Sequence, residues 1–461
     1  MSGQQSFNVS NVVDNQPIRK ITMLVFVLCF CAMLSDGYDL GVVGLAAPGI
    51  VKNFHIARSQ MSPVFSAALF GMLVGALSSG FLGDRFGRKR GIMLACLIIS
   101  LASFGCSTAG TFSSLIWLRF FTGIGLGGLL PNVTALMAEF LPQKVRGTFT
   151  TFAFMGITFG GILPGVVSSQ IVNGDWRDLF LIGGFVPLVA LPFIYVFLPE
   201  SLKFLALHPN RQAELRQSLR RVSADIDVPL GATFVLDEAI IQKFALSSLF
   251  DDGLKFITPL LWVAFITIML VNFFINSWLT LVLRDMGFTN AQAAGTVSLY
   301  YVGGVCGGLL IGPALDYIGP VILALYAVFG CIITALIGLP NSTQFITHVL
   351  VFLVGFSVLG AQVGMSSTAG LLYPTAIRSK GAGFAHSIGR FGAIGGPLLA
   401  GFLIAQHATL TVLFIVPAIP LAIAACAFLL ITRLWTGKVL GLGLARLRKD
   451  KPAEIKSALP I

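Results

Sequence analysis

Residues Gly80 to Arg90 read GFLGDRFGRKR and place one acidic and four basic side chains between two long apolar stretches. A related stretch, GPALDYIG, follows at Gly312 to Gly319 and keeps the spacing of two glycines and the aspartate. Corresponding residues differ by 232 in number, and the same offset separates Gly123 and Gly355, Gly128 and Gly360, Pro142 and Pro374, and Arg146 and Arg378. An internal repeat of this length predicts two similar halves.

The composition of the chain excludes a soluble protein. Of the 461 residues, 56% are hydrophobic and 11% are charged, whereas soluble domains carry roughly 25% charged residues. The mean hydropathy is +0.89. The 39 phenylalanines and the long Leu, Ile, Val and Ala runs also exclude disordered and fibrous chains. We therefore expect an all-α polytopic membrane protein.

The apolar stretches are long enough for twelve membrane spans. A bilayer-crossing helix needs about 20 mostly apolar residues, and the alternating segments of a membrane β-barrel are missing from the sequence. The first stretch already has spanning length, so we interpret it as its own insertion signal rather than a cleaved signal peptide. The predicted spans are 21–50, 61–83, 91–109, 113–138, 148–172, 178–198, 257–283, 291–315, 318–339, 344–373, 381–406 and 408–433.

The basic residues are distributed unevenly about these spans. With the N-terminus inside, 24 of the 30 Lys and Arg lie on the inner side and four on the outer side, while Arg119 and Arg390 lie within spans. This asymmetry follows the positive-inside rule and predicts cytoplasmic termini, a location in the inner (plasma) membrane and no nucleic-acid partner. The predicted domains are a tail 1–20, a six-helix bundle 21–198, a cytoplasmic connector 199–256, a second bundle 257–433 and a basic tail 434–461.

Three motifs resemble those of the major facilitator superfamily. The Gly80–Arg90 segment resembles its signature loop, and Arg119 with the glycines of 123–128 resembles its fourth-helix motif. Pro199-Glu200-Ser201 resembles the motif that ends its sixth helix. The resemblance covers essentially the whole chain. It implies twelve transmembrane helices in two six-helix halves, a substrate site between the halves and a monomeric carrier.

Two further motifs resemble one family within the superfamily. Asp36-Gly-Tyr-Asp39 in the span 21–50 and Gly389-Arg-Phe-Gly392 in the span 381–406 resemble the aromatic acid:proton symporters. The resemblance implies proton-coupled import of a small aromatic carboxylate, of the benzoate or hydroxybenzoate type, by alternating access. The alternative is an antiporter or exporter of amphipathic drugs or another organic anion, because the run from Gly147 to Pro164 partly resembles the antiporter motif of drug exporters.

Asp36 and Asp39 are the candidate proton-coupling groups. A carboxylate inside a membrane is costly and persists where it is paired, protonated or hydrated, and residues three apart share one helix face. Arg119 lies near the depth of Asp39 on an antiparallel span, so we expect an ion pair between them. Its guanidinium could exchange Asp39 for a substrate carboxylate. The alternative is a permanent tie between helices.

Arg390 is the candidate ligand of the substrate carboxylate. It has no acidic partner in the membrane core of its own half, and an unpaired buried cation favours binding of an anion. Packing or snorkelling of the side chain is the alternative. His386 lies four residues earlier on the same face and could relay protons or line the site. The other candidates for a polar and aromatic wall are Tyr38, Asn272, Asn276, Trp278, Tyr300, Tyr301 and Gln362.

The charged loop is a candidate conformational latch. By resemblance to the superfamily, Asp84 connects the second and eleventh helices, and Glu139 with Arg146 extends its network. A solvated loop is the alternative. The second copy of the loop departs from the pattern, because it has Tyr317 and Pro320 where the first has arginines. The latch candidates are Gly80, Asp84, Arg85, Gly87, Arg88, Arg90, Glu139, Arg146 and Asp316.

We expect no enzyme chemistry, metal ion or organic cofactor. The seven cysteines all fall within predicted spans and form no CxxC pair, so we interpret them as small hydrophobic residues. The glycines of 123–128 match a dinucleotide-binding pattern, but they lie inside a span and predict close helix packing instead. The sequence has no Walker loop, and the spans hold no Ser/His/Asp set or HExxH motif.

Overall fold

The computed structural model describes residues 6–8, 13–14, 16–170, 175–222, 233–235, 246–251, 254–339, 343–374 and 377–449. Twelve helices of 17 to 40 residues form the body of this described part. The first six are α2 (Lys20–Phe54), α3 (Ser62–Phe86), α4 (Arg88–Ser107), α5 (Phe112–Phe140), α6 (Gln143–Gln170) and α7 (Trp176–Phe197). The second six are α10 (Ile257–Asp285), α11 (Asn290–Ile318), α12 (Val321–Ile337), α13 (Gln344–Leu372), α14 (Arg378–Ala405) and α15 (Leu410–Lys449).

Eleven helices in the described ranges are long and apolar enough to cross a membrane by length and composition. The prediction of an all-α polytopic membrane protein is confirmed. The remaining long helix, α12, has 17 residues, short of the about 20 that a spanning helix needs. It is shorter than the predicted span 318–339, because Gly319 adopts a positive φ of 71° and Pro320 stands at the N-cap.

Short elements flank the two sets of long helices. The apolar face of α9 is buried through Leu215, Leu219 and Val222, which belong to the same hydrophobic core cluster as residues of α2 and α5. This packing attaches the connector to the first six helices. The short elements are β1 (Ser6–Asn8), η1 (Arg58–Met61), α8 (Leu202–Ala206), η2 (Pro209–Arg211), α9 (Gln212–Val222), β2 (Thr233–Val235), which pairs in parallel with β1, and η3 (Leu246–Leu249).

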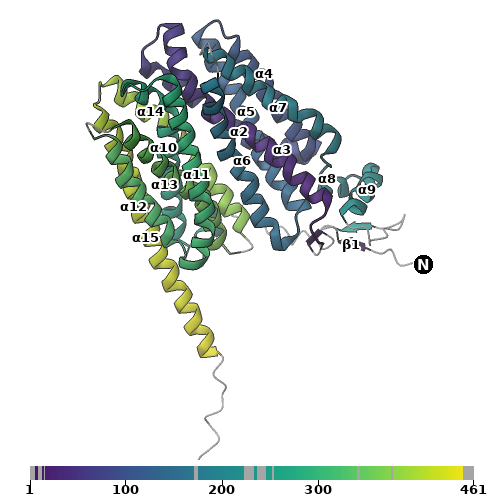
Figure 1. The fold of residues 1–461 in the computed structure, drawn as a ribbon. Coiled ribbons are helices and arrows are strands. Elements are labelled where there is room, and N and C mark those ends of the chain that lie inside the picture. The colour runs from purple at the N-terminus through teal and green to yellow at the C-terminus, as the bar shows by residue number, and fades with distance from the viewer. Residues whose placement is uncertain are drawn as a thin grey trace, which may run out of the picture.

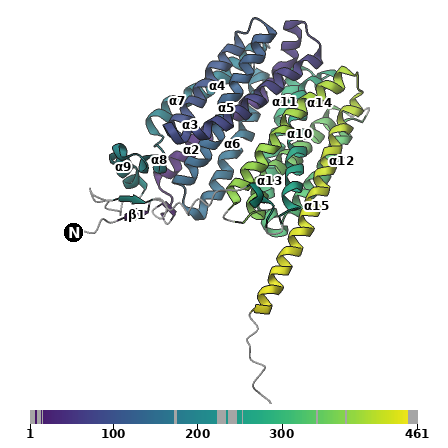
Figure 2. The same cartoon turned by 180° about the vertical axis from the view of Figure 1, so that it is seen from behind.

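The long helices form two bundles with the same internal packing. Helices α2–α7 make up one bundle and α10–α15 the other, and the bundles stand side by side in both views (Figure 1 and Figure 2). In the first bundle α2 packs on α6, α3 on α5 and α4 on α7. The second bundle repeats this as α10 on α14, α11 on α13 and α12 on α15. The repeat in the sequence therefore corresponds to a repeat in the structure.

The glycines of 123–128 pack helices tightly, as the sequence predicts. A Cβ at Gly123 would meet the backbone of Ala68, and a Cβ at Gly127 would meet the backbone of Met72, so α5 lies against α3 at the closest approach. Gly355 of the second bundle packs in the same way on the backbone of α11. Small residues of this kind allow helix backbones to approach within a membrane.

The bundles meet along a seam formed by α2 with α10, α3 with α14 and α6 with α11. We call the end of the molecule where α2 begins and α7 ends the terminus face, and the opposite end the far face (Figure 1). Each helix pair carries a hydrogen bond across the seam, and all six residues lie in the half of their helix nearer the far face. These bonds run from Asn276 Nδ2 to Leu40 O at 3.1 Å, from Ser66 Oγ to Ile394 O at 3.5 Å and from Ser298 Oγ to Ile162 O at 3.1 Å.

Further contacts close the seam at the far face. Arg58, just before α3, forms an ion pair with Asp285 at the end of α10. The rings of Phe65 and Trp278 meet edge to face with centroids 5.3 Å apart. Gly401 of α14 packs so closely that a Cβ there would meet the side chains of Ser62 and Trp278.

The same helices separate at the terminus face. A Cβ added at Gly80, Gly147, Gly312 or Gly383, which lie on α3, α6, α11 and α14, would meet nothing within 4 Å. Figure 1 shows the first bundle leaning away from the second toward this face. The described bonds across the seam thus lie on the far-face side, and the two bundles lean apart toward the terminus face (Figure 1).

Candidate functional site

A buried ion pair joins α2 and α5 in the first bundle. Arg119 donates from Nη1 to Asp39 Oδ1 at 2.6 Å and from Nη2 to Oδ2 at 2.8 Å. The side chains of Arg119 and Asp39 are 3% and 5% exposed, and the guanidinium carbon lies 5.8 Å from the ring centroid of Phe180. The pairing expected from the depths of the two residues is confirmed. Its bidentate geometry satisfies both carboxylate oxygens.

Asp36 lies one helical turn before Asp39, near the middle of α2, and its partner comes from the other bundle. Its side chain is buried, and the Oδ1 atom has no hydrogen-bond partner. The charge of Asp36 interacts with that of Arg390 on α14 across the seam, and more weakly with that of Asp39. Asp36 and Arg390 form no direct ion pair within the described part of the chain. We expected no acidic partner for Arg390 from its own half, and the sequence gives no sign that Asp36 of the other half faces it.

Arg390 presents a free guanidinium at the seam. It is half-buried, and no described residue forms a hydrogen bond or ion pair with it. Its nitrogens are absent from the set of buried unpaired atoms, so they retain accessible surface. One turn nearer the terminus face, His386 contacts Ser366 Oγ through Nε2 at 3.0 Å and packs edge to face on Phe265. This places His386 in the wall beside Arg390.

A tyrosine and an asparagine connect the second bundle to the acidic helix. Tyr301 Oη donates to Asn276 Oδ1 at 2.7 Å, and Asn276 Nδ2 donates to the carbonyl of Leu40, the residue after Asp39. The ring of Tyr301 packs over Gly161 of α6, and its hydroxyl interacts electrostatically with the two aspartates. Both residues, which the sequence suggests as wall candidates, therefore lie at the seam.

A second chain of polar side chains runs inside the second bundle. Tyr300 Oη donates to Asn272 Oδ1 at 2.7 Å, and Asn272 Nδ2 donates to Gln362 Oε1 at 2.5 Å. Tyr300 and Asn272 are buried, whereas Gln362 is half-buried. The chain thus connects α11, α10 and α13 and ends at an amide group.

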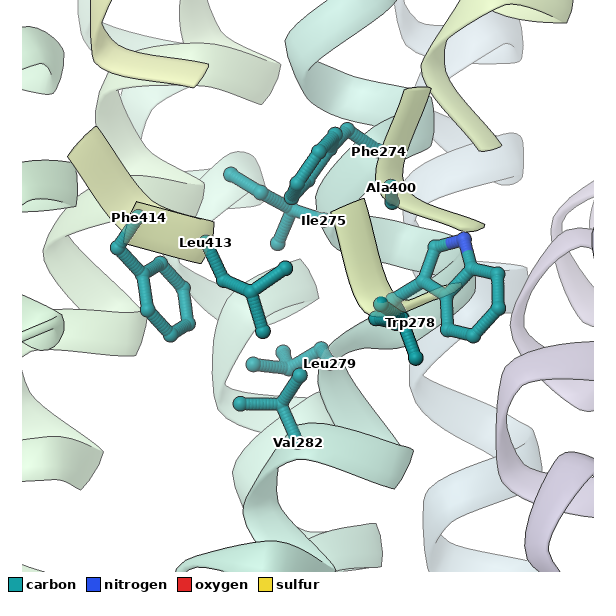
Figure 3. Close-up of a pocket in the computed structure, with 9 residues that line it drawn as sticks. Phe274, Ile275, Trp278, Leu279, Val282, Ala400, Leu413 and Phe414 are labelled. Atoms are coloured by element: carbon teal, nitrogen blue, oxygen red, sulfur yellow. The ribbon is translucent and has the colours of Figure 1, made fainter. Parts of the chain in front are cut away.

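Two aromatic candidates point away from this cluster. Tyr38 donates from Oη to the carbonyl of Leu179 at 3.0 Å, so its polar end is directed at α7 within the first bundle. Trp278 donates from Nε1 to the carbonyl of Pro397 at 3.1 Å. Its ring lines a small apolar pocket between α10, α14 and α15 (Figure 3). The sequence places both residues on the correct helices, but it does not show which face of the helix they occupy.

The latch candidates lie at the terminus face, and two of them, Asp84 and Arg88, contact each other within the first bundle. Asp84 pairs with Arg88 in its own loop, and its side chain is 71% exposed. The expected connection of Asp84 to α14 is absent from this conformation, because the bundles are apart at this face. Arg85 lies over the ring of Phe86, and Arg90 is exposed. Asp316 lies near the end of α11, and its side chain lies outside the described part.

Glu200, which the sequence marks only as part of a motif, holds the charged loop. It is 3% exposed and accepts hydrogen bonds from the backbone N–H groups of Lys89 and Ser201, both at 2.9 Å. Gly87 has a φ of +101°, and a Cβ there would collide with the Glu200 carboxylate, so this position requires glycine. The carboxylate therefore fixes the loop to the end of α7.

Glu139 and Arg146, which we expect to extend the network of Asp84, contact different partners. Glu139 accepts from Ser201 Oγ at 2.5 Å and from the backbone N–H of Lys203 at 3.2 Å. Arg146 forms an ion pair with Asp14 and donates to the carbonyl of Leu141. The two side chains instead join the connector and the N-terminal segment to the loop between α5 and α6.

The comparisons with known proteins agree with one another on the family of this chain. The family model described as Major Facilitator Superfamily matches residues 26–394 and 261–451. The gallate transporter of Pseudomonas putida is 34% identical over 426 residues, which are 92% of this chain and 94% of that protein. The 4-hydroxybenzoate transporter of Acinetobacter baylyi is 32% identical over 430 residues, again 92% and 94% of the two chains.

Solved structures share the fold. A bacterial homolog of the human lysosomal transporter Spinster, in an inward-facing and unoccupied conformation, superimposes with a TM-score of 0.67 at 16% sequence identity. The match covers 92% of this chain and 99% of that one. At this identity the likeness concerns the arrangement of helices alone.

Proposed function

The chain belongs to the major facilitator superfamily, and from this membership we propose that it imports a small aromatic carboxylate together with protons. Relatives named as transporters of gallate and 4-hydroxybenzoate match over nine-tenths of the chain and support the substrate class. One observation of the structure carries the proposal. The buried Asp36 of one bundle and the unpaired guanidinium of Arg390 in the other interact electrostatically across the seam, and each lies near the middle of its helix.

Arg390 is the ligand of the substrate carboxylate in this proposal. Its guanidinium lacks a hydrogen-bond or ion-pair partner among the described residues and keeps accessible surface. The planar fork of an arginine binds a carboxylate through two parallel hydrogen bonds. An organic anion that entered from the terminus face would therefore meet a bidentate donor halfway along α14.

Asp36 is the group that exchanges the proton. A substrate carboxylate that binds Arg390 neutralises the positive charge that stabilises the Asp36 carboxylate. Asp36 then binds a proton, because its negative charge has lost this stabilisation. Asp39 is less suited to this role, because Arg119 already satisfies both of its oxygens. Substrate binding and proton binding are thereby linked through one pair of side chains.

The charge of the substrate explains why coupling is needed. Moving an anion into a cell against an inside-negative potential of ~100 mV costs ~2.3 kcal/mol per charge. A proton that travels with the anion cancels this charge. Symport therefore allows accumulation that a uniporter of the same anion could not sustain.

We propose that the moving bodies are 21–198 and 257–433, joined by the cytoplasmic connector 199–256. The excess of Lys and Arg at the terminus face supports a cytoplasmic location for this face and for both termini, in the inner membrane. The conformation described here would then be open to the cytoplasm. Closing it requires α3 to approach α14 and α6 to approach α11 at Gly80 and Gly147.

The decisive experiment measures uptake of a panel of labelled aromatic acids by cells that express the chain, with and without a protonophore. We expect accumulation of hydroxylated benzoates that the protonophore abolishes. Accumulation that persists with the protonophore would contradict proton coupling. Uptake of the same acids into everted vesicles, driven by a pH gradient that is acidic inside, would favour the antiporter alternative.

A further inference from the structure

Resting on the proposed function, we propose that Gln362 donates a hydrogen bond to a ring oxygen of the aromatic substrate and so selects hydroxylated over unsubstituted aromatic acids. Asn272 and Tyr300 act as positioning residues for its amide group. Two features of the molecule support this role, namely the direction of one hydrogen-bond chain and the place of that chain beside Arg390.

The chain of hydrogen bonds has a defined direction. The Tyr300 hydroxyl donates to the Asn272 carbonyl oxygen, and the Asn272 amide donates to the Gln362 carbonyl oxygen. The carbonyl oxygen of each side-chain amide, Asn272 and Gln362, therefore already accepts a hydrogen bond. What remains at the end of the chain is the Gln362 Nε2 group, with two N–H donors and no partner among the described residues.

The neighbouring chain shows what a satisfied arrangement looks like. Tyr301 donates to Asn276, and Asn276 passes its own N–H to the carbonyl of Leu40. That chain ends on a backbone acceptor and ties the two bundles together. The chain through Gln362 ends on a half-buried donor that is not among the buried unpaired atoms, so its nitrogen retains accessible surface.

The register of two helices places this donor beside Arg390. On the antiparallel helices α13 and α14, Ser366 bonds to His386 at 3.0 Å. Gln362 lies one helical turn from Ser366 on α13, and Arg390 lies one turn from His386 on α14. In both helices this turn is on the side of the far face. The free amide and the free guanidinium therefore line the same stretch of the seam.

Asn272, which holds the Gln362 amide, lies deeper than the guanidinium. Met269 of α10 packs against Gly389, the neighbour of Arg390. Asn272 follows Met269 by three residues, which is about 5 Å further toward the far face. A benzoate whose carboxylate binds Arg390 and whose ring points toward the far face would bring its distal substituent to the amide chain.

The chemistry of the donor selects a substituent with a lone pair. A phenolic oxygen accepts from the N–H, whereas the C–H of an unsubstituted ring leaves the amide unpaired. A site built to hydrogen-bond a hydroxyl discriminates strongly against the analogue that lacks it. A single neutral hydrogen bond corresponds to a factor of up to about ten in affinity.

The test compares 4-hydroxybenzoate with benzoate, both as uptake into cells and as binding to the purified full-length protein. Gln362→Met keeps the length of the side chain and removes both amide groups. We expect it to lower the preference for 4-hydroxybenzoate over benzoate by up to about tenfold, with a larger loss of binding for 4-hydroxybenzoate than for benzoate. Tyr300→Phe should shift the preference in the same direction by a smaller factor. Retained benzoate binding shows that the variants fold.

Gln344→Met is the matched control, because the exposed Gln344 lies on the same helix at the far face and bonds to Gln292. This variant should change neither the binding nor the uptake of either acid. An equal loss of affinity for both acids in Gln362→Met would overturn the proposal. It would show that the Gln362 amide contacts the substrate carboxylate or serves packing, and not that it binds a ring oxygen. An unchanged preference would overturn the proposal as well. The wild-type protein could bind 4-hydroxybenzoate more tightly than benzoate and yet not accumulate it in cells. This result would contradict the proposed symport. The ratio of the two binding affinities in Gln362→Met would still test the role of Gln362.

Discussion

Asp36 on α2 and Arg390 on α14 interact electrostatically across the seam without forming a direct ion pair. This relationship distinguishes them from Asp39 and Arg119, which lie in contact within one bundle. Arg390 has no hydrogen-bond partner among the described residues and its nitrogens keep accessible surface, so its guanidinium is available to a third charged group. A substrate carboxylate could be that group and bind Arg390 while a proton neutralises Asp36.

Arg390→Lys should abolish high-affinity uptake although it keeps the positive charge. A lysine ammonium is a point charge and cannot reproduce the bidentate fork. We expect the apparent KM for an aromatic acid to rise at least tenfold, as for the loss of one charge-assisted hydrogen bond of about 1.5–3 kcal/mol. Initial uptake rates over a range of substrate concentrations measure this. The exposed Arg90 gives a control as Arg90→Lys, and normal transport by Arg390→Lys would remove Arg390 as the carboxylate ligand.

Asp36→Asn should separate transport from accumulation. The amide cannot take up and release a proton, but it preserves the shape of the side chain. We expect exchange of labelled for unlabelled substrate across proteoliposomes to continue, while uphill uptake driven by a pH gradient is lost. Asp251→Asn makes the same chemical change on an exposed residue of the connector and should retain both activities. Uphill uptake by Asp36→Asn would assign the proton to another group.

Arg119→Leu should destabilise the protein far more than the double variant Asp39→Asn with Arg119→Leu. The single change leaves a buried carboxylate without its counter-ion, which costs roughly 3–5 kcal/mol. The double change removes both charges and restores part of that loss. Thermal unfolding of the purified proteins in detergent measures the difference. If the single and double variants unfold at the same temperature, the unpaired Asp39 carboxylate is not the cause of the lost stability.

The sequence predicts the pair within a bundle but not the pair across the seam. The depth of Asp39 and Arg119 follows from counting residues along two neighbouring spans, and their ion pair is present. The meeting of Asp36 with Arg390 depends on how two halves dock, which no local spacing records. Trp278 illustrates a related limit, because its indole packs on Phe65 near the far face and donates to the carbonyl of Pro397 rather than turning toward the charged residues.

A disulfide between Arg58→Cys and Asp285→Cys should arrest the transporter in the present conformation. These residues form an exposed ion pair that bridges the bundles at the far face. Transport by alternating access requires this face to open, so oxidation should stop uptake and a reducing agent should restore it. Each single cysteine variant serves as a control under the same oxidant. Uptake that continues after complete cross-linking, as judged by gel mobility, would show that the far face need not open there.

Gly80→Leu should permit substrate binding in the conformation described here and yet slow transport. A side chain at Gly80 has open space now, since a Cβ at this position would meet no atom within 4 Å. The same side chain would obstruct the approach of α3 to α14 when the terminus face closes. We expect normal binding of an aromatic acid to the purified protein and a reduced maximal rate of uptake. Gly295→Leu is the matched control, because Gly295 on α11 also has open space but lies near the far face. A normal rate for Gly80→Leu would show that the two bundles do not close at this glycine.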